Sequence, residues 1–145
     1  MAEYQPVHPS EIYMGRLAHG ADLLEELTRI VVERGIRLGR IEAIGAVQRA
    51  RIGFYDQETR AYLYNDLDYP LEITLLSGNI SIKEGQPFVH AHVTLADEAG
   101  RAVGGHLAAG TIVFACEFMI QAFEGPVFER RLDETTGLPL WSGWR

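Results

Sequence analysis

Apolar side chains recur every three or four positions in one segment of the chain, from Ala21 to Glu33. The apolar positions are Leu23, Leu24, Leu27, Ile30 and Val31, and the charged positions between them are Asp22, Glu25, Glu26, Arg29 and Glu33. This spacing gives a helix one apolar face and one charged face. Gly35 supplies a stop after the last turn. The pattern therefore predicts one main amphipathic helix over residues 21–33.

Most of the chain after this segment follows the pattern of β-strands, either with alternating apolar and polar residues or as short apolar runs between turn residues. The predicted strands are residues 40–44, 47–55, 61–65, 71–76, 79–82, a hairpin within 87–106, and 111–123. One helix beside seven or eight closely spaced strands predicts an α+β fold with a largely antiparallel β-sheet.

The hairpin within residues 87–106 carries three of the five histidines of the chain. Alternation from Phe88 to Leu95 places His90 and His92 on one face of a strand and the apolar side chains on the other. A three-residue loop ending at Gly100 then pairs His92 with His106 and Thr94 with Gly104. A four-residue loop would turn His106 to the opposite face. The pair Gly104-Gly105 allows either a second bulge or the close approach of another backbone or a ligand.

Three imidazoles on one face of a hairpin can bind one metal ion. Neutral imidazole is the commonest protein ligand for transition metals, and three of them leave a fourth position open. We therefore predict a divalent transition metal, with zinc as the best fit, bound by His90, His92 and His106; imidazole also binds copper, nickel and iron. The alternative is that these are polar residues on a solvated strand. His8 and His19, beside Pro9 and Gly20, are expected outside the site.

Length and composition indicate a single compact domain over residues 1–145. The chain is 47% hydrophobic and 23% charged, and no linker-like stretch divides it. Its one cysteine, Cys116, lies in an apolar run and excludes an internal disulfide framework. No N-terminal stretch resembles a signal peptide, and the apolar runs are too short to span a membrane. We expect a cytoplasmic protein with no membrane partner.

Several segments, taken in order, resemble the PPC domain of plants and prokaryotes. After the predicted helix they are residues 41–46, 71–81, 90–96 (His-Ala-His at its start) and 104–107 (Gly-Gly-His-Leu). The resemblance covers a core of about residues 8–132, with residues 133–145 as a C-terminal tail. It implies an antiparallel-sheet domain that forms a homotrimer, with a metal-histidine site in prokaryotic members. It also implies a DNA-binding role, since plant members carry the domain beside AT-hook motifs, and this chain has no Arg-Gly-Arg-Pro segment.

The charge balance disfavours DNA as a partner, because affinity for a duplex depends on neutralising its phosphates. The formal net charge is −7, which becomes −21 in a trimer. One segment, residues 29–51, has a local balance of +4. Its basic residues are Arg29, Arg34, Arg37, Arg40, Arg49 and Arg51, against Glu33 and Glu42. These arginines could equally be solvated or paired to carboxylates at a subunit contact.

Glu117 is the candidate catalytic residue, since it is a lone carboxylate in the apolar run 111–120. It could act as a general base, as a fourth metal ligand, or as a partner that orients an imidazole. A salt bridge to an arginine is the structural alternative. The leading hypothesis is a metal-binding homotrimer with a regulatory or DNA-associated role. The alternatives are a small metal-dependent enzyme that uses the three-histidine site on an unknown substrate, and a binding module that has lost its metal.

Overall fold

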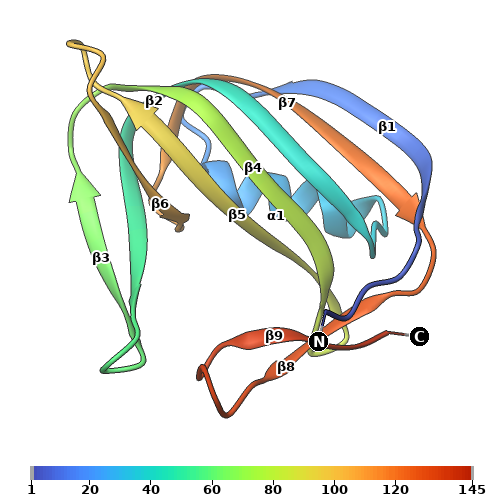
Figure 1. Ribbon diagram of the computed structural model, residues 1–145. Coiled ribbons are helices and arrows are strands. Elements are labelled where there is room, and N and C mark those ends of the chain that lie inside the picture. Colours follow the sequence, from blue (N-terminus) through green and yellow to red (C-terminus); the bar gives the residue numbers. More distant parts are fainter. Residues whose placement is uncertain (1, 145) are drawn as a thin grey trace.

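A computed structural model describes residues 2–144 of the chain as one compact domain with a single helix among its strands (Figure 1). The elements are β1 (His8–Leu17), α1 (Leu23–Glu33), β2 (Gly39–Asp56), β3 (Ala61–Leu67), β4 (Leu71–Lys83), β5 (Gln86–Ala96), β6 (Ala102–Leu107), β7 (Ile112–Glu124), β8 (Phe128–Leu132) and β9 (Pro139–Trp144). The sheet is antiparallel except where β8 runs parallel to β4. The predicted largely antiparallel α+β fold is confirmed.

The strands form one sheet that bends around the helix. Its order is β1-β7-β2-β6-β5-β4-β8-β9, with β3 added to β2. Strand β2 also pairs with β4, so β2, β6, β5 and β4 close a ring. In Figure 1, β7, β2, β4 and β5 arch over α1, and the β8–β9 hairpin lies at the lower end near the N-terminus. The ring brings β6 to the part of β2 that carries β3.

The core lies between α1 and the inner face of this arch. Leu23, Leu27 and Val31 of the helix are fully buried. The strands contribute alternate residues, of which Ile41, Leu76, Ile80, Val93 and Ile120 are nearly or fully inaccessible. Each buried side chain of this size contributes about 1.5–3 kcal/mol through removal from water. The helix α1 in residues 2–144 is not long and apolar enough to cross a bilayer.

Two of the long strands pass through positions that were predicted to separate shorter ones. Strand β2 continues through Gly45, which has a φ of +147° and lies at an irregularity in the pairing with β4. A Cβ atom at Gly45 would lie 2.1 Å from the carbonyl oxygen of Ala115, so the glycine permits close approach of β7. In β4, two predicted strands are likewise one, with a register shift near Thr74. Glycine here marks a bend in a strand, and the strand does not end there.

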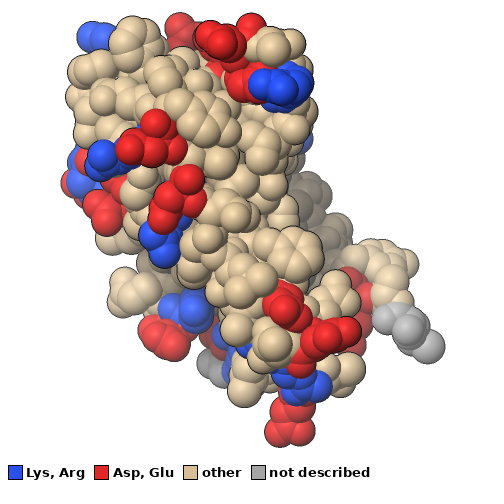
Figure 2. Space-filling model, turned by 90° about the vertical axis from the view of Figure 1, so that its left-hand side faces the viewer, with Lys and Arg blue, Asp and Glu red and all other residues tan. Residues whose placement is uncertain are grey.

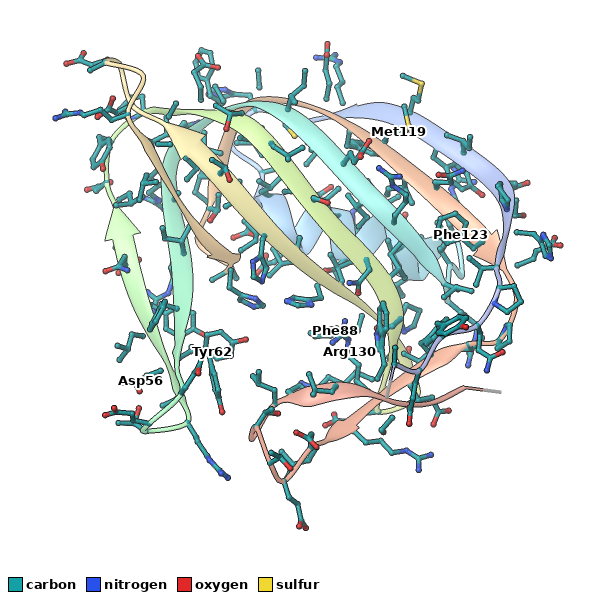
Figure 3. All side chains as sticks on the ribbon, in the orientation of Figure 1. Asp56, Tyr62, Phe88, Met119, Phe123 and Arg130 are labelled. Atoms are coloured by element: carbon teal, nitrogen blue, oxygen red, sulfur yellow. The ribbon has the colours of Figure 1, made fainter. Side chains whose placement is uncertain are left out.

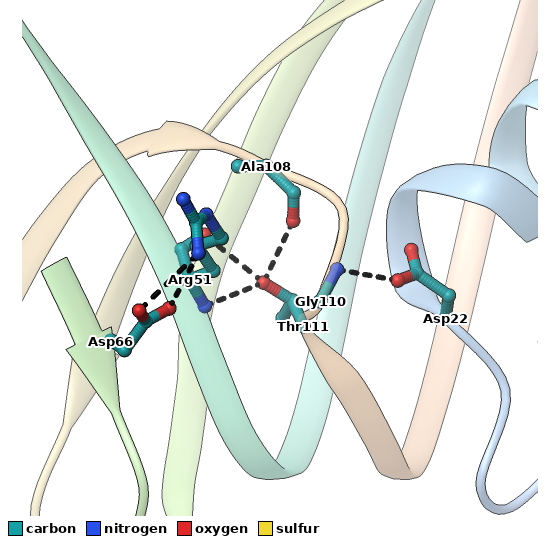
Figure 4. Close-up of polar contacts among 6 residues, drawn as sticks. All are labelled: Asp22, Arg51, Asp66, Ala108, Gly110 and Thr111. Atoms are coloured by element: carbon teal, nitrogen blue, oxygen red, sulfur yellow. Dashed lines mark hydrogen bonds and ion pairs between the residues drawn. The ribbon is translucent and has the colours of Figure 1, made fainter. Parts of the chain in front are cut away.

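Hydrogen bonds from two side chains fix the turn between β6 and β7 (Figure 4). Asp22 caps α1 by accepting from the amide of Glu25 at 3.1 Å, and its other oxygen accepts from the amide of Gly110 at 2.6 Å. The fully buried hydroxyl of Thr111 accepts from the Arg51 amide at 3.0 Å and lies 3.0 Å from the carbonyl oxygen of Ala108. The helix N-terminus, β2 and the end of β6 are thereby joined at one point.

Candidate metal centre

The histidine hairpin has the register that its sequence predicts. His92 pairs with His106, Thr94 with Gly104, and Ala96 with Ala102. The amide of Asp97 donates to the carbonyl of Arg101 at 3.0 Å, and Gly100 takes the left-handed conformation, with a φ of +76°. Turn chemistry and alternation together fix this register, because a slip of one residue would expose the buried face of β5.

The two glycines before His106 serve close approach between strands, since the β5–β6 register runs through them without a bulge. A Cβ atom at Gly104 would lie 2.6 Å from the carbonyl oxygen of Val93. One at Gly105 would lie 2.6 Å from the carbonyl oxygen of Gly53. His106 can therefore sit between β5 and β2 only because its predecessors have no side chain.

The three imidazoles converge on one point. One nitrogen from each of His90, His92 and His106 lies within 4.8 Å of the other two. The ring centroids of His90 are 5.1 Å from those of both His92 and His106. Around a tetrahedral zinc ion with bonds of about 2.0–2.1 Å, ligand nitrogens lie about 3.4 Å apart. Small side-chain rotations would bring the three nitrogens to that spacing.

His90 and His106 are half-buried and His92 is exposed, and the surroundings of the two half-buried rings suit metal binding. The Nδ1 atom of His106 is buried and has no hydrogen-bond partner. A buried nitrogen without a partner is costly, and a bound cation would satisfy it. Burial, followed by the positive charge of Arg130 and by His106 and His92, lowers the pKa of His90 from 6.5 to about 4. Burial is also the main cause that lowers the pKa of His106. Neutral imidazoles offer the lone pair that a metal requires.

A cavity of about 200 Å³ lies beside the cluster, and His90 and His106 form part of its wall. The ring of Tyr62 stands 4.9 Å from that of His106, centroid to centroid. The Nη2 atom of Arg130 lies 3.4 Å from Nδ1 of His90. Figure 3 shows Tyr62 on the β3 side and Phe88 and Arg130 on the β8 side of this space. No pattern in the sequence points to Arg130, because the parallel contact of β8 with β4 joins segments about 50 residues apart.

Glu117 is not part of the cluster. It lies on β7 with an exposed side chain, opposite Arg16 of β1 and Ile44 of β2. The buried neighbour in this strand is Cys116, so the carboxylate points away from the core. Within residues 2–144, the group that could hold a metal consists of the three histidines alone.

Three of the six arginines of the basic segment 29–51, namely Arg29, Arg40 and Arg51, form ion pairs with carboxylates. Arg29 bonds to Glu26 at 2.8 Å and to Glu33 at 2.7 Å, and Arg40 pairs with Glu42. Figure 2 shows acidic and basic side chains interspersed on one face of the molecule, with uncharged surface between them. That face carries no continuous basic surface of the kind that phosphate contacts need.

Comparison with models of known protein families shows to which family the chain belongs. The model of the Plants and Prokaryotes Conserved domain matches residues 4–124. The chain belongs to this PPC family. The match begins before β1 and ends with β7, so it includes the whole histidine hairpin. Strands β8 and β9, which supply Arg130 to the cavity, follow the matched region.

Solved structures of similar proteins share the fold over nearly the whole chain. A metal-containing protein from Archaeoglobus fulgidus is 42% identical, with a TM-score of 0.93 over 98% of this chain and 100% of the other. A PPC protein from Pyrococcus horikoshii is 33% identical, with a TM-score of 0.92 over 99% of both chains. The bifunctional protein GlmU of Synechococcus sp. (strain JA-2-3B'a(2-13)) is 34% identical over 140 residues, which are 93% of this chain. The PPC chain spans about a fifth of the length of such GlmU relatives.

Proposed function

We propose that this PPC protein binds one divalent transition metal ion through His90, His92 and His106, and that zinc is the metal that this ligand set suits best. The observation that carries the proposal is the convergence of three nitrogens, one of them from His106, a half-buried residue whose buried Nδ1 lacks a hydrogen-bond partner. Three imidazoles with a fourth position open match the ligand set of many zinc sites. The 42% identity to a metal-containing protein supports the same assignment.

A metal held in this way supplies a Lewis acid and lowers the pKa of a bound water. The residues around it set what can reach it. Arg130 keeps a positive charge beside His90, which favours the neutral imidazole. Burial raises the pKa of Tyr62, so its hydroxyl stays protonated and can donate a hydrogen bond. These groups support the small metal-dependent enzyme as the second candidate function, because a proton donor and a cation line the same cavity as His90 and His106.

Metal analysis tests the proposal. Protein expressed without a polyhistidine tag and purified without a nickel column is expected to carry about one equivalent of metal per chain after incubation with zinc and dialysis. His106→Ala should lose it, because two imidazoles remain. His8→Ala is the matched control, since His8 lies at the exposed start of β1. Less than about a third of an equivalent in the unaltered protein would contradict the proposal.

We also propose that the protein assembles as a homotrimer through the face of the sheet opposite α1. Exposed apolar side chains gather there on β1, β7, β2 and β4, namely Ile12, Met14, Ile44, Leu75, Phe114 and Met119. Met14 and Met119 are directly paired, and Figure 3 shows Met119 pointing away from the helix. Exposed apolar side chains on one sheet face are typical of a subunit interface, and Arg16, Glu42 and Glu117 lie between them in the strand register.

Sedimentation velocity tests the trimer. The expected mass is about 49 kDa, three times the 16.2 kDa of one chain. Met14→Glu places three carboxylates at the contact and should shift the protein toward monomer. Val32→Glu is the control, because Val32 is also exposed but lies on α1. A monomer at micromolar concentration would contradict this assembly.

Direct DNA binding is the weaker alternative, because carboxylates pair with three of the six arginines of the basic segment and the net charge is −7. Electrostatic binding to a duplex requires a steep loss of affinity as salt rises. A salt titration with labelled duplex should show no binding above the background of a neutral protein. Binding with a steep salt slope would instead favour the DNA-associated role.

A further inference from the structure

The cavity beside the three histidines contains a half-buried cation that is not paired with a carboxylate. Arg130 donates to the Ser81 hydroxyl and the Asn79 side-chain oxygen, each at 2.8 Å, and to the Pro139 carbonyl at 3.1 Å. All three acceptors are neutral. None of the ion pairs among the described residues includes this guanidinium. Its Nη2 also lies 3.4 Å from Nδ1 of His90, so one of the five N–H donors, on Nη1, has no partner among the described residues.

The guanidinium is also held rigidly. It lies 5.5 Å from the ring centroids of both Phe88 and Trp141. These rings and the three hydrogen bonds fix the plane of the side chain. The remaining Nη1 N–H and the fixed positive charge are suited to a carboxylate, which can accept one charge-assisted hydrogen bond from this side chain. A half-buried charge held in place without an anion is a ready partner for a negatively charged ligand.

A second cation lines the same cavity. The ammonium of Lys83 lies 5.1 Å from the centroid of the Phe88 ring and forms no ion pair with a described carboxylate. No aspartate or glutamate lines the cavity, although the chain has 20 acidic residues. This concentration of positive charge in an acidic protein would attract an anion to the opening.

The remaining walls limit the chemistry and size of that anion. Leu138, Leu140 and the rings of Phe88 and Tyr62 are apolar surfaces. Such walls favour an organic group over an inorganic ion. Since a water molecule occupies about 30 Å³ in the liquid, 200 Å³ holds roughly seven non-hydrogen atoms.

We propose that this cavity binds a small organic carboxylate, with its carboxylate on Arg130 and Lys83 and its apolar part against Phe88, Leu138 and Leu140. The inference rests on the proposed function for its chemistry, because His90 and His106 line the same cavity and would place the metal beside the ligand. A small organic carboxylate would therefore be the ligand class of the proposed metal site. The contact with Arg130 itself does not require the metal.

Calorimetry with isobutyrate, which has six non-hydrogen atoms, tests the proposal against the neutral isostere isobutyramide and against inorganic phosphate. Zinc-loaded protein should bind isobutyrate, and its affinity for isobutyramide and for phosphate should be at least tenfold lower. A charge-assisted hydrogen bond to a carboxylate is more favourable than a neutral hydrogen bond by about 1.4 kcal/mol, which corresponds to a tenfold difference in affinity. Equal binding of the amide would overturn the charge argument. Tighter binding of phosphate would overturn the organic class.

Two variants locate the site. Arg130→Gln should weaken isobutyrate at least tenfold, and Arg131→Gln is the matched control, because Arg131 is exposed on the same strand and pairs with Glu129. Lys83→Gln should weaken the binding of isobutyrate about threefold. Because this variant leaves the hydrogen bonds of Arg130 intact, it tests the site even if Arg130→Gln does not fold. Unchanged affinity in a folded Arg130→Gln protein, or in Lys83→Gln if Arg130→Gln unfolds, would overturn the proposal.

The same titration separates this inference from the proposed function. If zinc binds at one equivalent but isobutyrate does not bind, the carboxylate site is wrong and the metal site stands. If zinc does not bind but metal-free protein takes up isobutyrate in an Arg130-dependent manner, the carboxylate site stands and the metal site is wrong.

Discussion

Replacing Thr111 by valine is expected to destabilise the protein through hydrogen bonds alone. The hydroxyl is fully buried, and valine has nearly the same shape, so no cavity forms. The substitution removes the acceptor for the Arg51 amide at 3.0 Å and the donor to the Ala108 or Arg51 carbonyl at 3.0–3.1 Å. This threonine ties the end of β6 to β2, two residues from the position paired with His106.

The size of the effect follows from those bonds. A net contribution of about 0.5–1.5 kcal/mol per bond, with about 1–3 kcal/mol for leaving a buried amide unpaired, gives a loss of about 2–4 kcal/mol in the free energy of unfolding. For a domain with about 5–15 kcal/mol of stability this is a large fraction. With a urea dependence of about 2 kcal/mol per molar, the unfolding midpoint should fall by about 1–2 M.

Urea unfolding of the metal-free protein, followed by circular dichroism, measures this loss. Thr111→Ser is the matched control, because serine keeps the hydroxyl and loses only a methyl group. It should cost about 1 kcal/mol. If Thr111→Val is as stable as the unaltered protein, or more stable than Thr111→Ser, the buried hydroxyl does not hold β6 to β2 as argued.

Three further predictions concern the helix cap, the hairpin and the imidazoles. Asp22→Ala should lower the unfolding free energy by about 1–2 kcal/mol in urea unfolding, since the cap and the bond to Gly110 disappear together. Gly104→Ala should weaken zinc at least tenfold in a competition titration, because its Cβ would lie 2.6 Å from the Val93 carbonyl and force β5 and β6 apart. The metal-free protein should lose stability in urea as pH falls from about 6.5 toward 4. The pKa of His90 is lower in the folded state, so the unfolded state takes up its proton first.

Each of these has a control in the chain. Asp22→Asn keeps a capping oxygen and should cost less than Asp22→Ala; an equal loss would contradict the capping argument. Gly143→Ala meets no atom within 4 Å and should leave zinc affinity unchanged. In His90→Gln the stability should depend less on pH over this range, and an unchanged slope would mean that this imidazole is not the group that titrates.

Alternation and turn chemistry were sufficient to predict the hairpin. The side-chain period of two, with a loop ending at Gly100, allowed one register for His92 and His106. The interpretation of β2 as two strands followed from taking Gly45 as a stop, whereas Gly45 bends a continuous strand toward β7. Local residue type does not distinguish these cases, because the difference depends on which backbone lies alongside.

The elements that were not predicted lie at the edges of the sheet. Strand β1 pairs only with β7 and is exposed along most of its length, so no alternating apolar series marks it. Residues 133–145 were expected to be a tail, and 139–144 form β9 against β8. Arg130 enters the cavity from this hairpin. Such contacts depend on which distant strands lie side by side. Alternation along one strand indicates its buried face but does not identify its neighbours.

X-ray absorption spectroscopy of zinc-loaded protein tests the metal site most directly. The expected first shell consists of three imidazole nitrogens and one further light atom at about 2.0–2.1 Å, with the outer-shell scattering of three imidazoles. His106→Ala should reduce the imidazole count or abolish binding. A sulfur ligand at about 2.3 Å, or a shell of oxygens without imidazole scattering, would contradict a site built from His90, His92 and His106.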